Sequence, residues 1–225
     1  MLTAEQVQAL KTVDTPTICN AIEPFKVRGR VEGFMGFTIR CLLPELGVMA
    51  GYAVTLAVDS TTPGPEQDPQ VWREWLEAMR DAPKPAVLVM QDVGPQPEKS
   101  AHLGEVMGTV AKRLGVVGVV TDGGLRDILE VKALGLKCFA AGLTPAHGNP
   151  RLLAVNVPVV LDGVPVRPGD LLHGDVNGVT TIPLEIAGQV MDAVEAIRQD
   201  EAATMAYIRS AEFTIDGYMA RRFSH

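Results

Sequence analysis

The sequence predicts a layered α/β domain with a mixed sheet and a long helix near its carboxyl end. Helix-like and strand-like segments alternate over the first two thirds of the 225 residues, which is typical of parallel strands joined by helices. Short β-branched runs separated by Gly, Pro and Asp turns follow, and these favour antiparallel hairpins. Because 47% of the residues are hydrophobic, the chain can bury one sizeable core, and we expect a single domain over residues 1–225.

Two short helices are expected at the amino end. A capping box that begins at Thr3 predicts a helix to about Leu10. A second helix should begin near Asp14 and end before Pro24. The following residues, 27–37, are rich in glycine and arginine and should form a loop.

The next part of the chain alternates strands with a loop and a helix. Strands are expected at 38–43, 52–58 and 85–91, a loop with three prolines at 61–69, and a helix at 71–79.

The helix at 71–79 carries both tryptophans of the chain, Trp72 and Trp75, on one face with Leu76 and Met79. Large aromatic side chains are most often buried in a core or an interface. We therefore expect packing before any contact with a ligand.

A helix and a buried strand are predicted between Gly104 and Val120. Val106, Val110 and Leu114 repeat at helical spacing, and the helix should end at Gly115. Residues 116–120 are too short and too rich in valine for a helix, so they should form a strand buried on both faces.

A glycine-rich turn, Asp122-Gly123-Gly124, follows that strand and leads to Arg126 and Asp127. Open α/β sheets keep their sites at the carboxyl ends of strands. Arg126 and Asp127 are therefore the first candidates for a functional site, although an adjacent arginine and aspartate can also be an ordinary surface ion pair.

One more helix–strand unit should follow, with a helix at 128–134 and a strand at 136–140. In the last third we expect a hairpin over 157–166 around Asp162-Gly163, strands at 171–172 and 179–182, and a long helix at 184–210 with a short tail.

Composition excludes several classes of partner. The net charge of −7 and the 5% of aromatic residues argue against nucleic acid and against an anionic membrane. No apolar run is long enough to span a bilayer, and the first residues lack a signal-peptide pattern. Three scattered cysteines, Cys19, Cys41 and Cys138, favour free thiols. We expect a cytoplasmic protein.

Three common motifs are missing. The sequence has no G-x-x-x-x-G-K-[ST] loop, no G-x-G-x-x-G after a strand and no G-x-S-x-G elbow. Nucleotide binding and serine hydrolase chemistry therefore lack support.

The start of the helix at Gly104 could bind an anion. The first amides of a helix have no partner within it, and the helix dipole favours negative charge there. The amides concerned are those of Gly104, Glu105, Val106 and Met107. Alternatively, Gly104 is only a loop residue before a capped helix.

The residue types after the turn suit one kind of chemistry. Asp127 is the type of ligand that Mg²⁺ takes through one carboxylate and several waters. Arg126 offers a planar fork to a carboxylate or an enolate. Among the histidines, His102 could reach the same place but is more simply a loop residue, and His173 is more simply packing.

The segment from Gly104 to Asp127 resembles the RraA-like family, which includes 4-hydroxy-4-methyl-2-oxoglutarate aldolases. Three further segments carry the resemblance, namely 156–160, 166–170 and 174–179. The resemblance runs from about Asp14 to the carboxyl-terminal tail. It implies an α/β/β/α sandwich of the swivelling β/β/α type.

The resemblance also implies roles for the candidate residues. Asp127 would be the protein ligand of Mg²⁺ or Mn²⁺, and Arg126 would bind the carboxylate and the enolate of the substrate. Residues 104–107 would form the substrate loop, with Glu105 beside the water shell of the metal. The family forms homotrimers or homohexamers, in which a carboxyl-terminal acid of a neighbour, here Glu201 next to Asp200, completes the site. Residues 184–225 would then pack on that neighbour.

The function implied is a metal-dependent aldolase or decarboxylase acting on a small 2-oxo dicarboxylic acid through a pyruvate enolate. The alternative is a non-catalytic regulator that binds a protein such as a ribonuclease; those members lack the aspartate after the arginine, whereas Asp127 is present here. A methyltransferase would need a cofactor-binding glycine motif. The sequence departs from the family at 61–69, 93–99 and Asn177, around the expected site, and these departures bear on the substrate.

Overall fold

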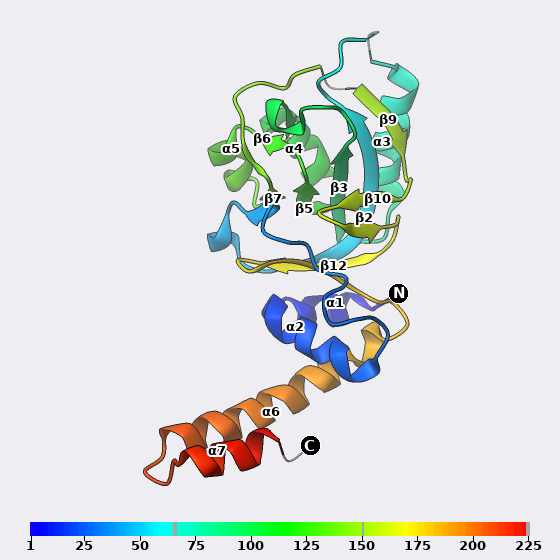
Figure 1. Ribbon diagram of the computed structural model, residues 1–225. Helices are drawn as coiled ribbons and strands as arrows, with labels where there is room; N and C mark the ends of the chain where they lie inside the picture. Colours follow the sequence, from blue (N-terminus) through cyan, green and yellow to red (C-terminus); the bar gives the residue numbers. More distant parts are fainter. Residues whose placement is uncertain (65–66, 150, 224–225) are drawn as a thin grey trace.

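A mixed eight-stranded sheet forms the centre of the protein (Figure 1). The computed structural model describes residues 1–64, 67–149 and 151–223. The strand order is β1-β7-β5-β3-β2-β12-β13, and β9 pairs with the far end of β2. The bounds of these strands are β1 Arg40–Cys41, β2 Met49–Asp59, β3 Ala86–Asp92, β5 Val116–Thr121, β7 Lys137–Ala140, β9 Arg151–Val155, β12 Leu171–Asp175 and β13 Gly178–Ile182.

Four neighbouring strands, β2, β3, β5 and β7, are parallel, and helices connect them across one face. These helices are α3 (Pro69–Asp81), α4 (Glu105–Arg113) and α5 (Ile128–Ala133). They bury one apolar cluster against the sheet, with Trp75 and Met79 of α3 at its centre. The parallel order explains why the strands read as continuous apolar runs, since both faces are covered.

Antiparallel strands pack on the other face of the sheet. The hairpin of β10 (Val159–Leu161) and β11 (Val164–Val166) packs on the opposite face of the sheet. Its turn residues Asp162 and Gly163 both have positive φ, at 48° and 81°, as a two-residue turn matched to strand twist requires. The expected mixed, layered sheet is therefore confirmed.

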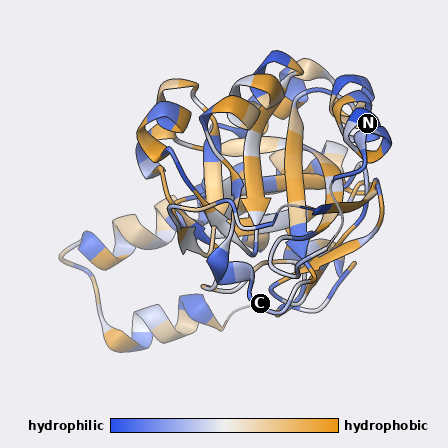
Figure 2. Ribbon diagram, turned by 90° about the horizontal axis from the view of Figure 1, so that it is seen from above, coloured by the Kyte–Doolittle hydropathy of each residue, from blue (hydrophilic) through white to orange (hydrophobic). Residues whose placement is uncertain are grey.

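A separate apolar cluster joins the amino-terminal helices to the long carboxyl-terminal helix. Helices α1 (Ala4–Leu10) and α2 (Thr15–Ile22) pack with the start of α6 (Val190–Arg209) against β2, β12 and β13. The capping box at Thr3 and the cap at Asp14 are both present. Beyond this cluster, α6 leaves the body and α7 (Ile215–Arg222) folds back along it, so that the two helices form an arm (Figures 1 and 2).

A small parallel sheet lies beside the main one and carries the candidate site. It consists of β4 (Ala101–Leu103), β6 (Gly124–Leu125) and β8 (Gly142–Leu143), in that order. The remaining short elements are single 3₁₀ turns, η1 Glu23–Phe25, η2 Pro44–Leu46, η3 Pro97–Lys99 and η4 Ala187–Gln189.

Several sequence predictions need correction. The strand at 38–43 is reduced to Arg40–Cys41, and the short strands β4, β6, β8 and β9 were not predicted. The long helix begins at Val190 after a 3₁₀ turn, and the tail contains the helix α7. Residues 61–69 contain the expected loop up to Asp68, of which residues 65 and 66 lie outside the described part.

The helix predicted from the spacing of Val106, Val110 and Leu114 is confirmed as α4, but its valines do not form the buried face. Val106 is 74% exposed, whereas Gly108 and Ala111 are the buried residues of this helix. The helix approaches the core so closely that small residues face it: a Cβ on Gly108 would lie 3.2 Å from the side chain of Leu134. Spacing alone had favoured the bulkier valines.

Among the described residues, no helix is long and apolar enough to cross a membrane. All three cysteines are free thiols, as expected. Burial raises the pKa of the Cys138 thiol to about 12, which makes it an inert core residue.

Candidate functional site

The small sheet brings the two ends of the predicted segment together. Leu103 at the end of β4 pairs in parallel with Leu125 at the end of β6. The residues that follow each strand, Gly104-Glu105 and Arg126-Asp127, therefore emerge side by side. The amide of Arg126 donates to the carbonyl of Leu103 at 3.0 Å. A hydrogen bond from the amide of Glu105 to Oδ2 of Asp127, also 3.0 Å long, closes the pair.

Asp127 stands at the first position before α5 with a left-handed backbone, φ 51°. Its side chain is 40% exposed and that of Arg126 is 38% exposed, with 3.7 Å between Arg126 Nε and Asp127 Oδ2. A half-exposed pair at that distance contributes little stability by itself. The amide of Glu105, rather than the arginine, fixes the carboxylate.

Gly104 is required by this close approach. A Cβ at this position would lie 2.5 Å from Asp127 Oδ2 and 3.0 Å from Arg126 Cγ. The absence of a side chain thus lets the backbone touch both candidate residues. Gly104 is also the N-cap residue of α4, and it has no side chain of its own to accept the first amides of that helix.

The expected anion-binding loop is therefore partly used within the protein. The amide of Glu105 already has Asp127 as its acceptor, whereas the amides of Val106 and Met107 in the first turn of α4 have no acceptor in the described part of the chain. These two amides and the guanidinium of Arg126 remain for a carboxylate.

Asp127 fits a divalent cation with few protein ligands. Its Oδ2 accepts one amide, and its Oδ1 accepts no hydrogen bond from the described residues. Among the described residues, no group of three or more acidic, histidine or cysteine side chains is arranged so that it could hold a metal ion. A single half-exposed carboxylate with a free oxygen suits Mg²⁺ or Mn²⁺, because Mg²⁺ keeps most of its waters. Glu105, whose amide donates to Asp127, is exposed.

A cavity of about 290 Å³ opens beside Arg126. It reaches from Gly104, Met107 and Arg126 under α3 and β9. Its other lining residues are Leu56, Val58, Ser60, Gln67, Trp72, Trp75, Met90, Ala101, His102, Leu103, His147 and Leu152. Trp75 is buried as predicted, but both tryptophans also line the cavity.

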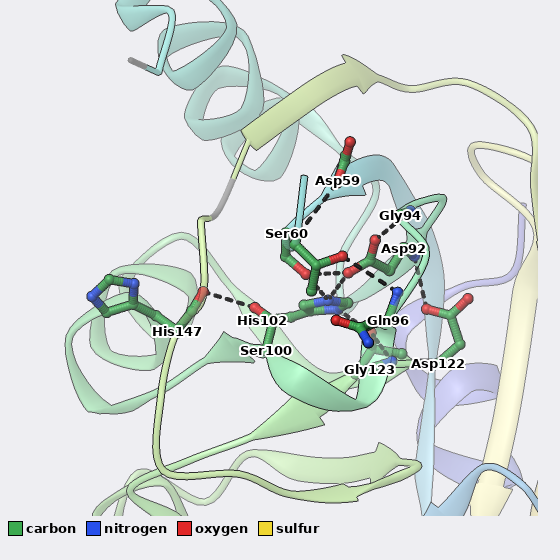
Figure 3. Close-up of polar contacts among 12 residues, drawn as sticks. Asp59, Ser60, Asp92, Gly94, Gln96, Ser100, His102, Asp122, Gly123 and His147 are labelled. Atoms are coloured by element: carbon green, nitrogen blue, oxygen red, sulfur yellow. Dashed lines mark hydrogen bonds and ion pairs between the residues drawn. The ribbon is translucent and has the colours of Figure 1, made fainter. Parts of the chain in front are cut away.

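A buried polar cluster lies behind the cavity, and the sequence analysis did not identify it (Figure 3). His102 of β4 joins the ends of two central strands: Nε2 lies 2.9 Å from Asp92 Oδ2, and Nδ1 lies 2.6 Å from Thr121 Oγ1. Ser60 also donates to Asp92. The side chains of His102 and Asp92 are 2% and 0% exposed. The expectation that His102 is an ordinary loop residue is wrong.

The two aspartates of this region have opposite pKa shifts. Burial alone would raise the pKa of Asp92, but hydrogen bonds from His102, Ser60 and the Gly94 amide outweigh it and hold this pKa below its usual value. Burial raises the pKa of Asp122 to about 6, although its carboxylate accepts the amide of Asp92 at 2.8 Å.

One signal in the sequence could have predicted the cluster. Three parallel strands end in an apolar run followed by an aspartate, namely Asp59, Asp92 and Asp122. Carboxyl ends of neighbouring parallel strands meet at one edge of a sheet. The position of His102 between them depends on the strand β4, which was not predicted.

Two other candidates lie away from this site. Glu201 and Asp200 are exposed on α6, and the outer part of this helix lies in the arm, away from β6 and α5, the elements on either side of Arg126 (Figure 1). His173 is fully buried, with Nε2 3.0 Å from the carbonyl of Leu10 and Nδ1 3.0 Å from Thr15 Oγ1. Its interpretation as a packing residue is confirmed.

The fold and the site together define a class of protein: a layered α/β domain whose arginine and aspartate stand opposite a helix start at the ends of two short parallel strands. A family model described as RraA-like, Aldolase/RraA, matches residues 15–181. The chain belongs to this family, and its fold, with the long carboxyl-terminal helix, is of the RraA-like type.

Two relatives carry different descriptions. A "Putative 4-hydroxy-4-methyl-2-oxoglutarate aldolase" of Halalkalibacterium halodurans is 35% identical over 147 residues, which cover 65% of this chain and 69% of that protein. An uncharacterized protein of Methanocaldococcus jannaschii is 28% identical over 203 residues, 89% of this chain and 88% of its own length.

Solved structures support the fold. A structure of an uncharacterized protein from Pseudomonas syringae pv. tomato superposes with a TM-score of 0.75 at 22% identity, covering 100% of this chain and 95% of that one. Streptomyces coelicolor RraAS2, described as an unusual member of the RNase ES inhibitor RraA family, gives 0.70 at 25% identity, covering 92% and 98%.

Proposed function

We propose that this protein is a divalent-metal-dependent carbon–carbon lyase acting on a small 2-oxo acid through a pyruvate enolate. The observation that carries the proposal is the placement of Arg126 and Asp127 against Gly104, with a half-exposed carboxylate and a guanidinium side by side. The name of the H. halodurans relative points in the same direction. Both retro-aldol cleavage and decarboxylation of oxaloacetate pass through this enolate.

The substrate carboxylate is assigned to Arg126 and the start of α4. The guanidinium can donate two parallel hydrogen bonds to it. The amides of Val106 and Met107 lie at the helix start, where the helix dipole favours a negative charge. The same positive charge then stabilises the enolate oxygen as the bond breaks. Stabilisation of charge that develops in the reaction lowers its barrier.

Asp127 would hold the metal, with Glu105 beside its water shell. A Mg²⁺ or Mn²⁺ ion there would act as a Lewis acid toward the 2-oxo oxygen. No lysine is among the described residues that line the cavity, so a Schiff base has no nitrogen to form on at this site. The hydrogen bond from the Glu105 amide would hold the carboxylate of Asp127 in position to bind the ion.

Pyruvate release tests the proposal. Purified protein is given 4-hydroxy-4-methyl-2-oxoglutarate or oxaloacetate with Mg²⁺ or Mn²⁺, and then with a chelator. Because metals alone decarboxylate oxaloacetate, the rate is compared with that of Arg126→Ala at the same metal concentration. Arg167→Ala, which removes an exposed arginine on another surface, is the matched control.

Turnover that needs the metal and Arg126, but not Arg167, supports a lyase. Equal rates for the wild type and Arg126→Ala would refute it. The remaining candidate would then be a regulator that binds a protein partner such as a ribonuclease, which the likeness to S. coelicolor RraAS2 favours.

We also propose that the arm of α6 and α7 packs on a neighbouring copy in a homotrimer or homohexamer. Apolar side chains of the arm are exposed, including Ile215 at 75% and Phe223 at 70%, and surfaces of this kind mark interaction sites. Glu201 would thereby reach the Arg126 of another subunit.

Subunit complementation tests this arrangement. Arg126→Ala and Glu201→Gln should each be inactive alone, and mixing the two variants during refolding should restore part of the activity. Only a site shared between subunits can be rebuilt in this way. A monomer by light scattering, or no recovery in mixed oligomers, would contradict the arrangement.

A further inference from the structure

The cavity beside Arg126 has an apolar interior. Beyond its mouth at Gly104 and Arg126 it is lined mainly by aliphatic, sulfur-containing and aromatic side chains. Leu56, Met90 and Trp75 are buried in the core as well. Trp72 and Trp75 meet edge to face, with ring centroids 5.1 Å apart. The two rings give this wall a large apolar surface, and their indole Nε1 groups have no hydrogen-bond partner among the described residues.

Positive charge is confined to one end of the cavity. Among the described residues that line it, Arg126 alone carries a permanent charge. Both ring nitrogens of His102 are already bound to Asp92 and Thr121. Arg151, the neighbour of the lining residue Leu152, is paired with Asp59 at 2.5 Å.

A second carboxylate would therefore be poorly placed in this cavity. Burying a charge among apolar groups without a partner is costly, and Arg126 is needed for the carboxylate of the 2-oxo acid. A dicarboxylic substrate, as expected from the sequence, would need a second cation, and the described residues that line the cavity do not supply one.

We propose that the cavity takes an apolar substituent on C4 of a 4-hydroxy-2-oxo acid, a branched aliphatic or aromatic group. This inference rests on the proposed lyase function and names its substrate class. The carboxylate and the 2-oxo group lie at Arg126 and Asp127, and C4 points its apolar group toward Trp72 and Leu152.

The products follow from the bond that breaks. The C3–C4 bond is cleaved, and its electron pair stays on C3 as the enolate of pyruvate. The C4 hydroxyl loses its proton and becomes the carbonyl of an apolar aldehyde or ketone. A proton returned to C3 completes pyruvate. Atoms and electrons balance without an oxidant or a reductant.

Binding is tested with two 2-oxo acids that do not react. 4-Methyl-2-oxopentanoate ends in an isopropyl group, and 2-oxoglutarate ends in a carboxylate. The chain has two tryptophans and both line the cavity, so its intrinsic fluorescence reports this cavity directly. With Mg²⁺ present, we expect the branched acid to bind about tenfold more tightly, the scale of discrimination set by a methyl-sized group in an apolar pocket. Equal or tighter binding of 2-oxoglutarate would overturn the proposal.

Turnover is tested with a matched pair of substrates. 4-Hydroxy-4-methyl-2-oxopentanoate has a methyl group where 4-hydroxy-4-methyl-2-oxoglutarate has its C4 carboxylate. Leu152→Lys adds a cation to the cavity wall and should shift the ratio of kcat/KM toward the dicarboxylate by about tenfold or more. Leu152→Met, an apolar replacement of similar volume, should leave that ratio unchanged.

The outcomes separate the two proposals. Turnover of oxaloacetate that needs both the metal and Arg126, with no shift of the ratio in Leu152→Lys, would refute the apolar cavity and leave the lyase standing. No turnover of any 2-oxo acid would refute the lyase and the inference built on it. Because comparing two substrates on one preparation cancels any loss of folded protein, the ratio stays informative even if Leu152→Lys is less stable.

Discussion

The amide of Glu105 donates to Oδ2 of Asp127 at 3.0 Å, across a separation of 22 residues. This bond ties the first residue of α4 to the residue before α5. It also orients the carboxylate whose other oxygen has no partner in the described chain. The start of one helix thus positions the candidate metal ligand at the start of another.

Replacing Gly104 by alanine should disrupt this arrangement without unfolding the protein. The new Cβ would lie 2.5 Å from Asp127 Oδ2 and 3.0 Å from Arg126 Cγ, so both side chains must move. A displacement of about 1 Å at a reacting centre can cost roughly 100-fold in rate. We expect pyruvate release to fall by about that factor while the circular dichroism spectrum stays unchanged. Gly142→Ala is the control, since a Cβ there meets no atom within 4 Å; equal activity in the two variants would contradict this account.

Asp127→Asn separates the charge of Asp127 from its structural hydrogen bond. Asparagine tolerates the left-handed backbone at φ 51° and can still accept the amide of Glu105. We expect folding to be preserved, activity to drop at least about 100-fold, and Mn²⁺ binding, followed by electron paramagnetic resonance, to be lost. Asp127→Ala should in addition lower the free energy of unfolding, by about 1 kcal/mol, because the amide loses its acceptor. Unaltered Mn²⁺ binding in Asp127→Asn would remove this residue from the metal site.

The sequence was sufficient for the segment that holds the candidate site. Arg126 and Asp127 were selected because a buried strand must end in a turn at the edge of the sheet, and Gly104 because it begins a helix. Local patterns selected the two ends of the segment separately, and the resemblance to the RraA-like family joined them in one site. The structure places them together.

What the sequence did not predict depends on contacts between distant residues. β4 has three residues and owes its existence to pairing with β6, so no local pattern marks it. Without β4, His102 could not be placed between Asp92 and Thr121. The cavity was missed for the same reason. Trp72 was assigned to packing from its helical spacing, and the opposite wall is formed by β9, another strand that was not predicted.

His102 should matter mainly for stability and for the position of Gly104. In His102→Ala, the carboxylate of Asp92, with a side chain 0% exposed, loses its ring partner, and so does Thr121. Ser60 and the Gly94 amide still donate to Asp92. Because one hydrogen bond to a buried charge contributes about 2 kcal/mol, chemical denaturation should show a loss of that size. The exposed His147 provides the control, because among the described residues its ring bonds only to the adjacent carbonyl of Gly148. His147→Ala should change the free energy of unfolding by less than about 0.5 kcal/mol. Similar losses in both variants would show that the buried cluster is not the cause.

Asp122→Asn should stabilise the protein above pH 6. Burial raises the pKa of Asp122 to about 6 from an ordinary value of 3.8, so the folded state holds a proton that the unfolded state has already released. The free energy of unfolding therefore decreases as the pH rises through this window, and the loss is complete above pH 6. Asparagine cannot ionise, and its Oδ1 can still accept the amide of Asp92. At pH 7.5 we expect a gain of about 1 to 2 kcal/mol over the wild type, and near pH 4 almost none.

Asp59 supplies the opposite case, because the Thr62 amide and Arg151 hold its pKa at about 2. Asp59→Asn should therefore destabilise the protein at pH 7.5. Denaturation curves at the two pH values, at one protein concentration, check both signs, and a uniform gain of Asp122→Asn at pH 4 and 7.5 would rule out the ionisation as its origin.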